Sequence, residues 1–266
     1  MTKPIIYRAD KPLSVKIEKS ISLLHKSEKL ALQYNDFGYH LAFSGGKDSQ
    51  AVYELCKMAN VKFKAFFYKT SVDPSELLHL IRDKYPDVEW IKPGMTMYQL
   101  ILKKKMLPTR LARFCCAYLK ERQGINAVVI TGIRALESTR RAARKELEHM
   151  CISGQDKVMM HPLFDWSERD VYEFLKIRGV EMCSLYGKLD RIGCIGCPMS
   201  DSGQRKEFAL FPNFKLAYLN TIKKLMERHG AYKDFGTAEN VMDWWTSGLS
   251  KKEWVEKRKQ TKIEWD

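Results

Sequence analysis

Residues 39–59 read YHLAFSGGKDSQAVYELCKMA, which is an apolar run, two glycines and then a run with helical periodicity. The apolar run at 39–44 predicts a buried strand, and the spacing of apolar residues at 48–59 predicts a helix. The glycines between them allow the sharp turn that joins the two elements. Such a turn directs backbone N–H groups and a helix N-terminus toward one place, which favours binding of an anion.

Strand and helix patterns keep alternating along the chain. Further strands are predicted at 61–68, 88–93 and 126–133, with a short fifth strand at 159–166. Helices are predicted at 13–33, 74–85, 96–105 and 167–179. Because parallel strands need a crossover connection, this alternation predicts an α/β fold with a parallel sheet and right-handed crossovers.

The pattern changes after about residue 179. A loop that contains cysteines is followed by helical segments at 206–229 and 240–259, with a Trp244-Trp245 pair that we expect to be used in packing. We therefore expect three parts: an N-terminal helical extension at 1–36, an α/β domain at 37–180, and a cysteine loop with a helical C-terminal region at 181–266.

The chain is basic, with 46 Lys and Arg residues, 32 Asp and Glu residues and a net charge of +14. Twelve basic and two acidic residues lie within 101–145, so the local net charge there is +10. This concentration suits a polyanion, either the phosphates of a nucleotide or the backbone of a nucleic acid. The alternative is a solvated basic face with no binding role.

The sequence carries no signal for membrane insertion or secretion. No apolar run approaches the roughly 20 residues of a membrane span, and the first residues lack the apolar core of a signal peptide. We therefore expect a soluble cytoplasmic protein with no membrane partner. In that reducing compartment, seven irregularly spaced cysteines do not indicate a disulfide framework, which leaves packing, metal binding or catalysis.

The glycine turn, SGGKDS at residues 44–49, has the composition of a phosphate-binding loop. The two glycines let the backbone approach an anion closely, and Lys47 adds a positive charge. Ser44 and Ser49 carry hydroxyl groups that can donate hydrogen bonds. The loop matches neither GxxxxGK[ST] nor GxGxxG. A tight turn without a ligand is the alternative, although such a turn needs only the glycines.

SGGKDS after the first strand resembles the pyrophosphate loop of the PP-loop ATP pyrophosphatases, the adenine nucleotide alpha-hydrolase group. In that group the loop holds the pyrophosphate of ATP while AMP is transferred. The resemblance implies a Rossmann-like open parallel sheet of about five strands with helices on both faces, within a nucleotide-binding domain at 37–180. It also implies that ATP and Mg²⁺ are bound by Ser44, Gly45, Gly46, Lys47, Asp48 and Ser49.

Four cysteines form two close pairs, Cys115 and Cys116 in RFCCAYLK, and Cys194 and Cys197 in GCIGCPM. Neighbouring cysteines rarely bond to each other, because consecutive Cα atoms are about 3.8 Å apart whereas a disulfide needs about 5.5 Å. Four thiolates are enough for a tetrahedral zinc site or for a 4Fe-4S cluster. Unliganded thiols are the third alternative.

Tandem cysteines followed by a CxxC resemble the iron-sulfur subgroup of the phosphoadenylylsulfate (PAPS) reductase family, in which four such cysteines bind a 4Fe-4S cluster. The resemblance implies a cluster at Cys115, Cys116, Cys194 and Cys197, with Lys120 near it. The remaining cysteines are expected to be buried or free thiols, namely Cys56, Cys151 and Cys183.

Two further segments carry the same resemblance. TGIRALESTR at 131–140 is similar to the arginine motif of the family, which implies that Arg134 and Arg140 contact phosphate or sulfate oxygens and that Gly132 belongs to the nucleotide site. HPLFDWSERDVYEFL at 161–175 resembles a mainly structural signature of the family.

Two features separate this chain from the reductases of that family. Those enzymes use a nucleophilic cysteine near the C-terminus, whereas no cysteine follows Cys197 here. Their phosphate loop is commonly altered, whereas SGGKDS is complete and points to ATP. The leading hypothesis is an ATP pyrophosphatase of the PAPS reductase family that activates an acceptor for sulfur transfer, similar to the DNA phosphorothioation enzymes.

In this hypothesis the catalytic residues are Lys47, Asp48 and Arg134, with Asp48 helping to place Mg²⁺. The partners are an adenine nucleotide, a nucleic acid (DNA or tRNA) and a sulfur-donor protein such as a cysteine desulfurase. One alternative is a PAPS or adenylylsulfate (APS) reductase whose nucleophile is Cys151, Cys183 or a partner's cysteine. The other is a regulatory protein that binds nucleotide or nucleic acid and senses redox state through its cluster.

Overall fold

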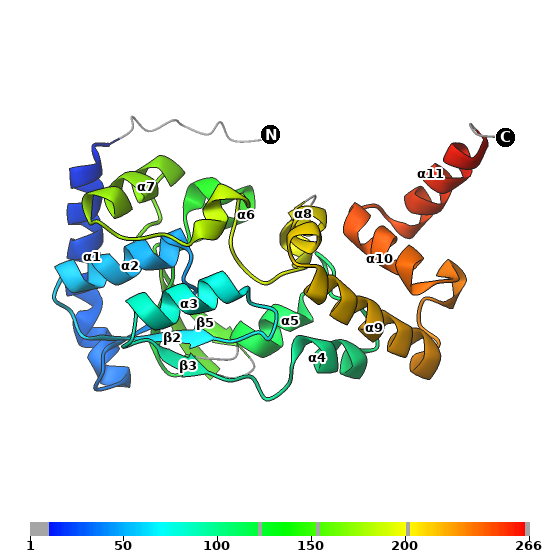
Figure 1. The fold of residues 1–266 in the computed structure, drawn as a ribbon. Helices are drawn as coiled ribbons and strands as arrows, with labels where there is room; N and C mark the ends of the chain where they lie inside the picture. Colours follow the sequence, from blue (N-terminus) through cyan, green and yellow to red (C-terminus); the bar gives the residue numbers. More distant parts are fainter. Residues whose placement is uncertain (1–10, 122–123, 153–154, 201–202, 264–266) are drawn as a thin grey trace, which may run out of the picture. The chain divides into compact units, whose positions relative to one another are not determined.

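The computed structural model describes residues 11–121, 124–152, 155–200 and 203–263. The chain divides into two compact units, each built from three separated segments (Figure 1). The first, called the sheet unit below, comprises residues 1–67, 84–90 and 123–182. The second, called the helical unit, comprises residues 68–83, 91–122 and 183–266. The domain boundaries expected at 37 and 181 stay predictions.

Within the described residues, six strands form one sheet in the order β3-β2-β1-β4-β6-β5. The strands are β1 Tyr39–Ala42, β2 Phe63–Tyr68, β3 Glu89–Ile91, β4 Val128–Ile130, β5 Leu147–Ile152 and β6 Gln155–Met160. β1 pairs in parallel with β2 and β4, and β4 pairs in parallel with β6. The predicted α/β class with a mostly parallel sheet is confirmed.

The hairpin of β5 and β6 differs from the prediction of about five parallel strands. β5 runs antiparallel to β6 at the edge of the sheet, and β6 ends at Met160, where the predicted strand at 159–166 had only begun. Leu147–Ile152 reads LEHMCI, which carries Glu and His on an edge strand and so lacks the continuous apolar run of a buried strand. The apolar run at 159–166 therefore overlaps β6 only at the last two residues of the strand.

The helices of the sheet unit cover the strands and supply much of its core. They are α1 Leu13–Tyr34, α2 Lys47–Met58, α6 Thr139–Ala142 and α7 Glu168–Ile177, with a 3₁₀ turn, η2, at Ala135–Glu137. α2 lies against both α1 and α7, as can be followed in Figure 1. Tyr39, Leu41, Leu55, Trp166 and Phe174 are almost completely buried between these elements.

A buried ion pair joins α1 to the start of α7. Lys16 Nζ lies 2.6 Å from Asp170 Oδ2, and both residues are buried. The same carboxylate accepts hydrogen bonds from the backbone N–H and the hydroxyl of Ser167, at 2.6 and 2.8 Å. Burial raises the pKa of Asp170, but the bonds from Lys16 and Ser167 outweigh it and hold that pKa below its ordinary value. The N-terminal helix is therefore fixed by charge as well as by apolar packing.

Replacing Lys16 with Met should lower the free energy of unfolding by about 3 kcal/mol, because Asp170 would remain buried without its cation. The measurement is a urea unfolding series at neutral pH. The matched control is Lys19→Met on the same helix, whose side chain is 44% exposed and pairs with Glu146 and Asp165. Lys19→Met should lower the free energy of unfolding by less than about 1 kcal/mol. Equal losses in the two variants would contradict the prediction.

The helical unit contains most of the helices. They are α3 Ser75–Lys84, α4 Met97–Lys104, α5 Phe114–Cys116, α8 Gly203–Leu210, α9 Pro212–His229, α10 Ala238–Ser247 and α11 Lys251–Ile263. Short 3₁₀ turns are η3 Ser184–Gly187, η4 Pro198–Ser200 and η5 Lys233–Phe235, and a π-helical turn, η1, spans Ala117–Glu121. None of the helices in the described part of the chain has the length and apolar character needed to cross a bilayer.

The two helices predicted at 206–229 and 240–259 are each divided in the structure. Pro212 begins α9 at its first helical position, and the residue before a proline is disfavoured in helical conformation, which separates α8 from α9. Gly248 ends α10 in the left-handed conformation, with φ of 72°. Helical periodicity continues across both breaks, and for that reason it predicted single helices.

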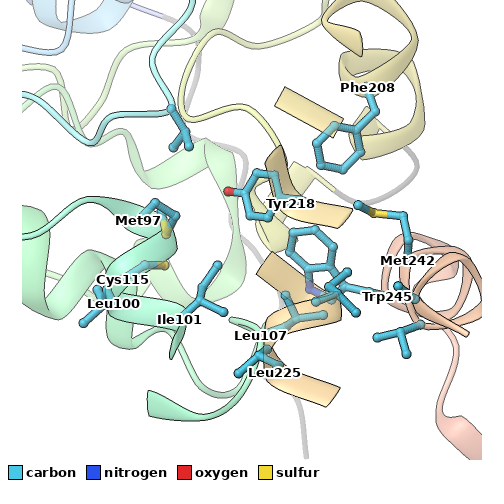
Figure 2. Packing of buried hydrophobic residues seen from close by; sticks show 14 of the residues in the cluster. Met97, Leu100, Ile101, Leu107, Cys115, Phe208, Tyr218, Leu225, Met242 and Trp245 are labelled. Atoms are coloured by element: carbon cyan, nitrogen blue, oxygen red, sulfur yellow. The ribbon is translucent and has the colours of Figure 1, made fainter. Parts of the chain in front are cut away.

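The core of the helical unit is rich in aromatic rings, as Figure 2 shows for Phe208, Tyr218 and Trp245. The centroid of the Tyr218 ring lies 5.5 Å from that of Phe208 and 5.1 Å from that of Trp245. The Trp245 indole donates to the carbonyl of Pro108 at 2.7 Å, so its polar atom is satisfied within the core. Cys115 belongs to the same buried cluster. This core holds the segment that carries the tandem cysteines.

Candidate functional site

The phosphate loop lies in the sheet unit between β1 and α2. Gly45 has a φ of 71°, in the left-handed region that favours glycine, and Gly46 is the N-cap residue of α2. The Ser44 N–H donates to Ser49 Oγ at 3.2 Å, and the Ser49 hydroxyl donates to the Gly46 carbonyl at 2.9 Å. No side chain of the described residues caps the N-terminus of α2. Within the loop the Gly46 N–H donates to Ser44 Oγ at 3.4 Å. A helix N-terminus without a side-chain cap is a place where an anion is favoured.

Two buried cations lie beside this helix terminus. Lys47 Nζ is 3.3 Å from Asp48 Oδ2 and 3.2 Å from Glu168 Oε1, and Arg134 Nε donates to Asp48 Oδ1 at 2.7 Å. The side chains of Lys47 and Arg134 are only 8% and 6% exposed. Glu137 accepts a hydrogen bond from the backbone N–H of Arg134 at 2.9 Å. The cations are thus paired with carboxylates in a network at the helix N-terminus.

Gly132 allows the segment after β4 to reach the phosphate loop. A Cβ atom added at Gly132 would lie 2.7 Å from the Cβ and 2.8 Å from the carbonyl carbon of Asp48, distances that a real Cβ does not adopt. Only glycine fits there without a shift of backbone. Two residues later, Arg134 reaches Asp48. The structure therefore brings four predicted site residues together, namely Lys47, Asp48, Gly132 and Arg134.

Arg140 is placed differently. It lies on α6 with an exposed side chain, and it forms no hydrogen bond or ion pair with the described residues. Glu168 was missed by the sequence analysis, although it follows the predicted N-cap Ser167 at the start of α7. Tyr172, on the same helix, was also missed, and its ring centroid lies 5.8 Å from Lys47 Nζ. A charged first turn of a helix is common, so the sequence held no signal for the role of Glu168.

A buried histidine follows β6 and forms a hydrogen bond with the residue after β4. His161 Nδ1 lies 2.7 Å from Thr131 Oγ1, and the Thr131 N–H donates to the Met160 carbonyl at 3.0 Å. His161 is fully buried, and its Nε2 has no hydrogen-bond partner among the described residues. Burial, with a smaller effect of Arg144, lowers the pKa of His161 to about 4. The imidazole is therefore neutral in the folded protein at neutral pH.

The low pKa of His161 predicts a loss of stability in acid. Below the ordinary pKa of about 6.5 the unfolded chain takes up a proton that the folded chain refuses, so stability is complete above pH 6.5 and falls as the pH approaches 4. Over this pH range the free energy of unfolding of the His161→Asn variant should fall by about 1–3 kcal/mol less than that of the wild type. Urea unfolding at pH 7.5, 6 and 5 measures it. The control is His79→Asn, at an exposed site. If the free energy of unfolding of the His161 variant falls with pH as steeply as that of the wild type, the prediction is refuted.

The four predicted cysteines line one cavity in the helical unit. The other walls are Thr70, Met97, Pro108, Leu119, Lys120, Gly196, Pro198 and Tyr218. None of the four forms a disulfide. One pair of cysteines comes from α5 and the other from the loop before η4, two segments that are far apart in the sequence. The structure thus gathers the tandem cysteines, the CxxC and Lys120 in one place.

Backbone bonds hold the CxxC loop in shape. The Ile195 N–H donates to the Val72 carbonyl at 2.8 Å, and the Gly196 N–H donates to Glu207 Oε2 at 2.8 Å. Gly196 has a φ of 75°, and an added Cβ would lie 2.6 Å from the ring of Phe208. Glycine is therefore required at this turn between the two cysteines.

The charges around the cavity favour thiolate sulfur at one position. The hydrogen bond from Cys115 lowers the pKa of Cys116 to about 6, helped by the charges of Lys120 and Arg113. The interaction with Cys194, and next that with Asp73, raises the pKa of Lys120, which keeps this half-buried lysine cationic. Cys194 Sγ also donates to Thr70 Oγ1 at 3.4 Å. A cation beside several thiols suits a soft, thiolate-bound metal group.

Four free thiols and the half-buried Lys120 line a common cavity, and four thiols are the donor set of a four-cysteine metal group. In the described ranges, however, no three His, Cys, Asp or Glu side chains stand together as ligands of a single ion. The iron-sulfur cluster therefore stays a prediction. Of the other cysteines, Cys56 and Cys183 are buried, and the side chain of Cys151 lies outside the described part of the chain.

A family model of the phosphoadenosine phosphosulfate reductase domain matches residues 38–200. The chain belongs to this family. The match includes both the phosphate loop and the four cysteines, and it places the chain in the PP-loop superfamily. The predicted family is confirmed at this level, whereas the iron-sulfur subgroup and the likeness to phosphorothioation enzymes are not tested by it.

Curated relatives of this PAPS reductase family member include proteins with different names. An uncharacterised protein of Methanocaldococcus jannaschii is 27% identical over 71% of this chain and 42% of its own length. The probable FAD synthase of Schizosaccharomyces pombe is 27% identical over 56% of the chain and 55% of its own length. The adenosine 5'-phosphosulfate reductase of Allochromatium vinosum is 27% identical over 59% of the chain and 66% of its own length. The chain spans about half the length of the first two of these relatives.

Among solved structures, the FMN adenylyltransferase of Candida glabrata, in complex with FMN and an ATP analogue, is similar with a TM-score of 0.51. The sequences are 14% identical, and the match covers 72% of this chain and 66% of that chain. This likeness confirms the fold of the family and says nothing of the substrate. Relatives that are named for an activity are enzymes of the PP-loop superfamily.

Proposed function

We propose that this PAPS reductase family protein is an ATP pyrophosphatase that transfers AMP to an acceptor. The observation that carries the proposal is the uncapped N-terminus of α2 with Lys47 and Arg134 buried beside it. A helix N-terminus and two desolvated cations form a strong site for a polyphosphate. The probable FAD synthase among the relatives supports a nucleotide triphosphate as substrate.

In the proposed reaction, a nucleophile of the acceptor attacks the α-phosphorus of ATP, and the bond from that phosphorus to the bridging oxygen breaks. The electron pair leaves with pyrophosphate. The N–H groups at Gly45, Gly46 and Lys47 and the Lys47 ammonium would hold this leaving group. Asp48 would hold Mg²⁺, which neutralises charge on the phosphates. Arg134 positions Asp48 through their ion pair and adds positive charge at the α-phosphate.

The second part of the proposal concerns the cysteine cavity. Cys115, Cys116, Cys194 and Cys197 would hold a 4Fe-4S cluster with one thiolate on each iron, and this cluster would brace the cysteine cavity. Lys120 would offset the negative charge of the thiolates, since it lines the same cavity. The acceptor is a nucleic acid, DNA or tRNA, in keeping with the net charge of +14, and a cysteine desulfurase or a similar protein supplies the sulfur.

Lys47→Ala should reduce pyrophosphate release from ATP by about 100-fold or more, because a buried cation at the leaving group would be lost. The assay uses the full chain, Mg²⁺, ATP labelled at the γ-phosphate and a nucleic-acid acceptor. The control is Lys57→Ala, at the other end of α2, whose side chain is 54% exposed. Equal rates for the two variants would refute the role of the loop.

The relative named as an adenosine 5'-phosphosulfate reductase favours a second candidate, reduction of a sulfonucleotide. The two candidates are separated by the same preparation incubated with thioredoxin and either PAPS or APS. Release of sulfite without release of pyrophosphate from ATP would replace the proposed reaction by reduction.

Protein purified without oxygen should contain about four irons per chain, and Cys115→Ser should lose most of them. The control is Cys56→Ser, because Cys56 is buried and does not line the cysteine cavity, so this variant should leave the iron content unchanged. Iron and zinc analysis with an absorbance spectrum measures both. About one zinc per chain, or no metal at all, would refute the cluster without bearing on pyrophosphate release.

A further inference from the structure

The turn between α4 and α5 of the helical unit carries an apolar side chain in full contact with solvent. Leu111 is 99% exposed, more than any of the other exposed large apolar residues described. Leu111 and Arg110 occupy the centre of a four-residue turn, Thr109 to Ala112. We call residues 109–112 the Leu111 turn. A single exposed leucine is common on protein surfaces, so its surroundings decide whether it has a role.

The Leu111 turn is held rigidly on the core. The Ala112 N–H donates to Thr109 Oγ1 at 3.0 Å, and the Thr109 N–H donates to the Ala112 carbonyl at 3.3 Å, so the turn is closed by two bonds. Just before it, the Pro108 carbonyl accepts the bond from the buried Trp245 indole. One residue earlier, the Leu107 N–H donates to Tyr232 Oη at 3.0 Å. The leucine is thus presented outward by fixed backbone, which reduces the entropy lost when a partner binds it.

The surroundings of the turn are basic. Residues 101–121 contain six basic residues and one acidic residue, Glu121. Lys103, Lys104 and Lys105 are exposed at the end of α4, and Arg110 is exposed beside Leu111 in the turn. Arg113 follows the turn with its side chain 35% exposed. This charge disfavours a basic or neutral apolar partner and favours a polyanion.

We propose that the Leu111 turn binds duplex DNA, with Leu111 inserted between base pairs and the neighbouring cations on the phosphates. An exposed aliphatic wedge flanked by Arg and Lys is the side-chain set with which proteins enter the minor groove and unstack a base step. The narrow minor groove of DNA attracts arginine, whereas the minor groove of duplex RNA is wide and shallow. This inference rests on the proposed function and deepens it, since it names DNA as the acceptor.

The position of the turn relates DNA binding to the cysteine cavity. The turn is preceded directly by Pro108 and followed, after two residues, by Cys115, and both Pro108 and Cys115 line that cavity. DNA bound on the Leu111 turn would therefore lie next to the group of four thiols.

The test measures binding of the full chain to a fluorescent 20-base-pair DNA by anisotropy, without ATP. Leu111→Ser should weaken binding at least 5-fold and leave the salt dependence unchanged. Arg110→Gln should weaken binding and reduce the slope of log affinity against log salt by about 0.9, the value of one phosphate contact. The control is Leu216→Ser on α9, where the leucine is 57% exposed, and it should bind like the wild type.

A second readout reports the wedge itself. A DNA with 2-aminopurine in the duplex should become more fluorescent when the wild type binds, because the base unstacks, and Leu111→Ser should abolish this increase. Equal affinity for the Leu111 and Leu216 variants overturns the proposal, as does tighter binding to duplex RNA or to anionic vesicles than to DNA. Because no nucleotide is present, these results are independent of the loss of pyrophosphate release in Lys47→Ala.

Discussion

The close approach of Gly132 to Asp48 is the contact on which the sheet unit's site depends. Because Gly132 has no Cβ, the segment after β4 passes against the first turn of α2, and Arg134 reaches the Asp48 carboxylate at 2.7 Å. This pairing compensates the burial of the Arg134 guanidinium, which would otherwise be costly. The same carboxylate also faces Lys47. A single missing methyl group therefore permits the whole arrangement of charge at the helix N-terminus.

The helical unit also depends on a glycine at a close approach, here between the CxxC loop and an aromatic ring. Gly196 turns the CxxC loop at a position where an added Cβ would strike Phe208, and the buried Glu207 carboxylate holds the Gly196 N–H. Burial raises the pKa of Glu207, although its hydrogen bonds from Ser200 and Gly196 oppose this. In both units a glycine allows two segments to meet and a carboxylate fixes the meeting point. Site residues that are far apart in the sequence are thereby brought close together in space within each unit.

Much of this was predictable from local patterns. The segment 39–59 has the strand, turn and helix that its apolar spacing indicates, because one continuous pattern determines all three elements. The edge strands β5 and β6 were not predictable in the same way, because Glu148 and Lys157 interrupt the apolar run that marks a buried strand. The breaks at Pro212 and Gly248 needed attention to single residues within a long periodic pattern.

The residues of the candidate site also differ in whether a local sequence pattern could predict them. Lys47 and Asp48 were recognisable because the loop is contiguous, and Arg134 because it stands in a motif. The partner of Lys47, Glu168, comes from a helix 121 residues away, and its only sequence feature is a position in a first helical turn. Pairings between distant segments are set by the packing of α2 against α7, which no local pattern contains.

The ion pair between Lys47 and Glu168 has a consequence for affinity. The Glu168 side chain is 58% exposed, whereas that of Lys47 is 8% exposed, so the lysine is already dehydrated when the protein folds. An incoming polyphosphate would exchange with a surface carboxylate and would not have to strip water from a free ammonium group. If the proposed function holds, Glu168 would compete with the polyphosphate for Lys47, and its removal would tighten anion binding while Asp48 still faces the lysine. Such an exchange would favour highly charged ligands, because only an anion that binds more strongly than a single carboxylate gains from it.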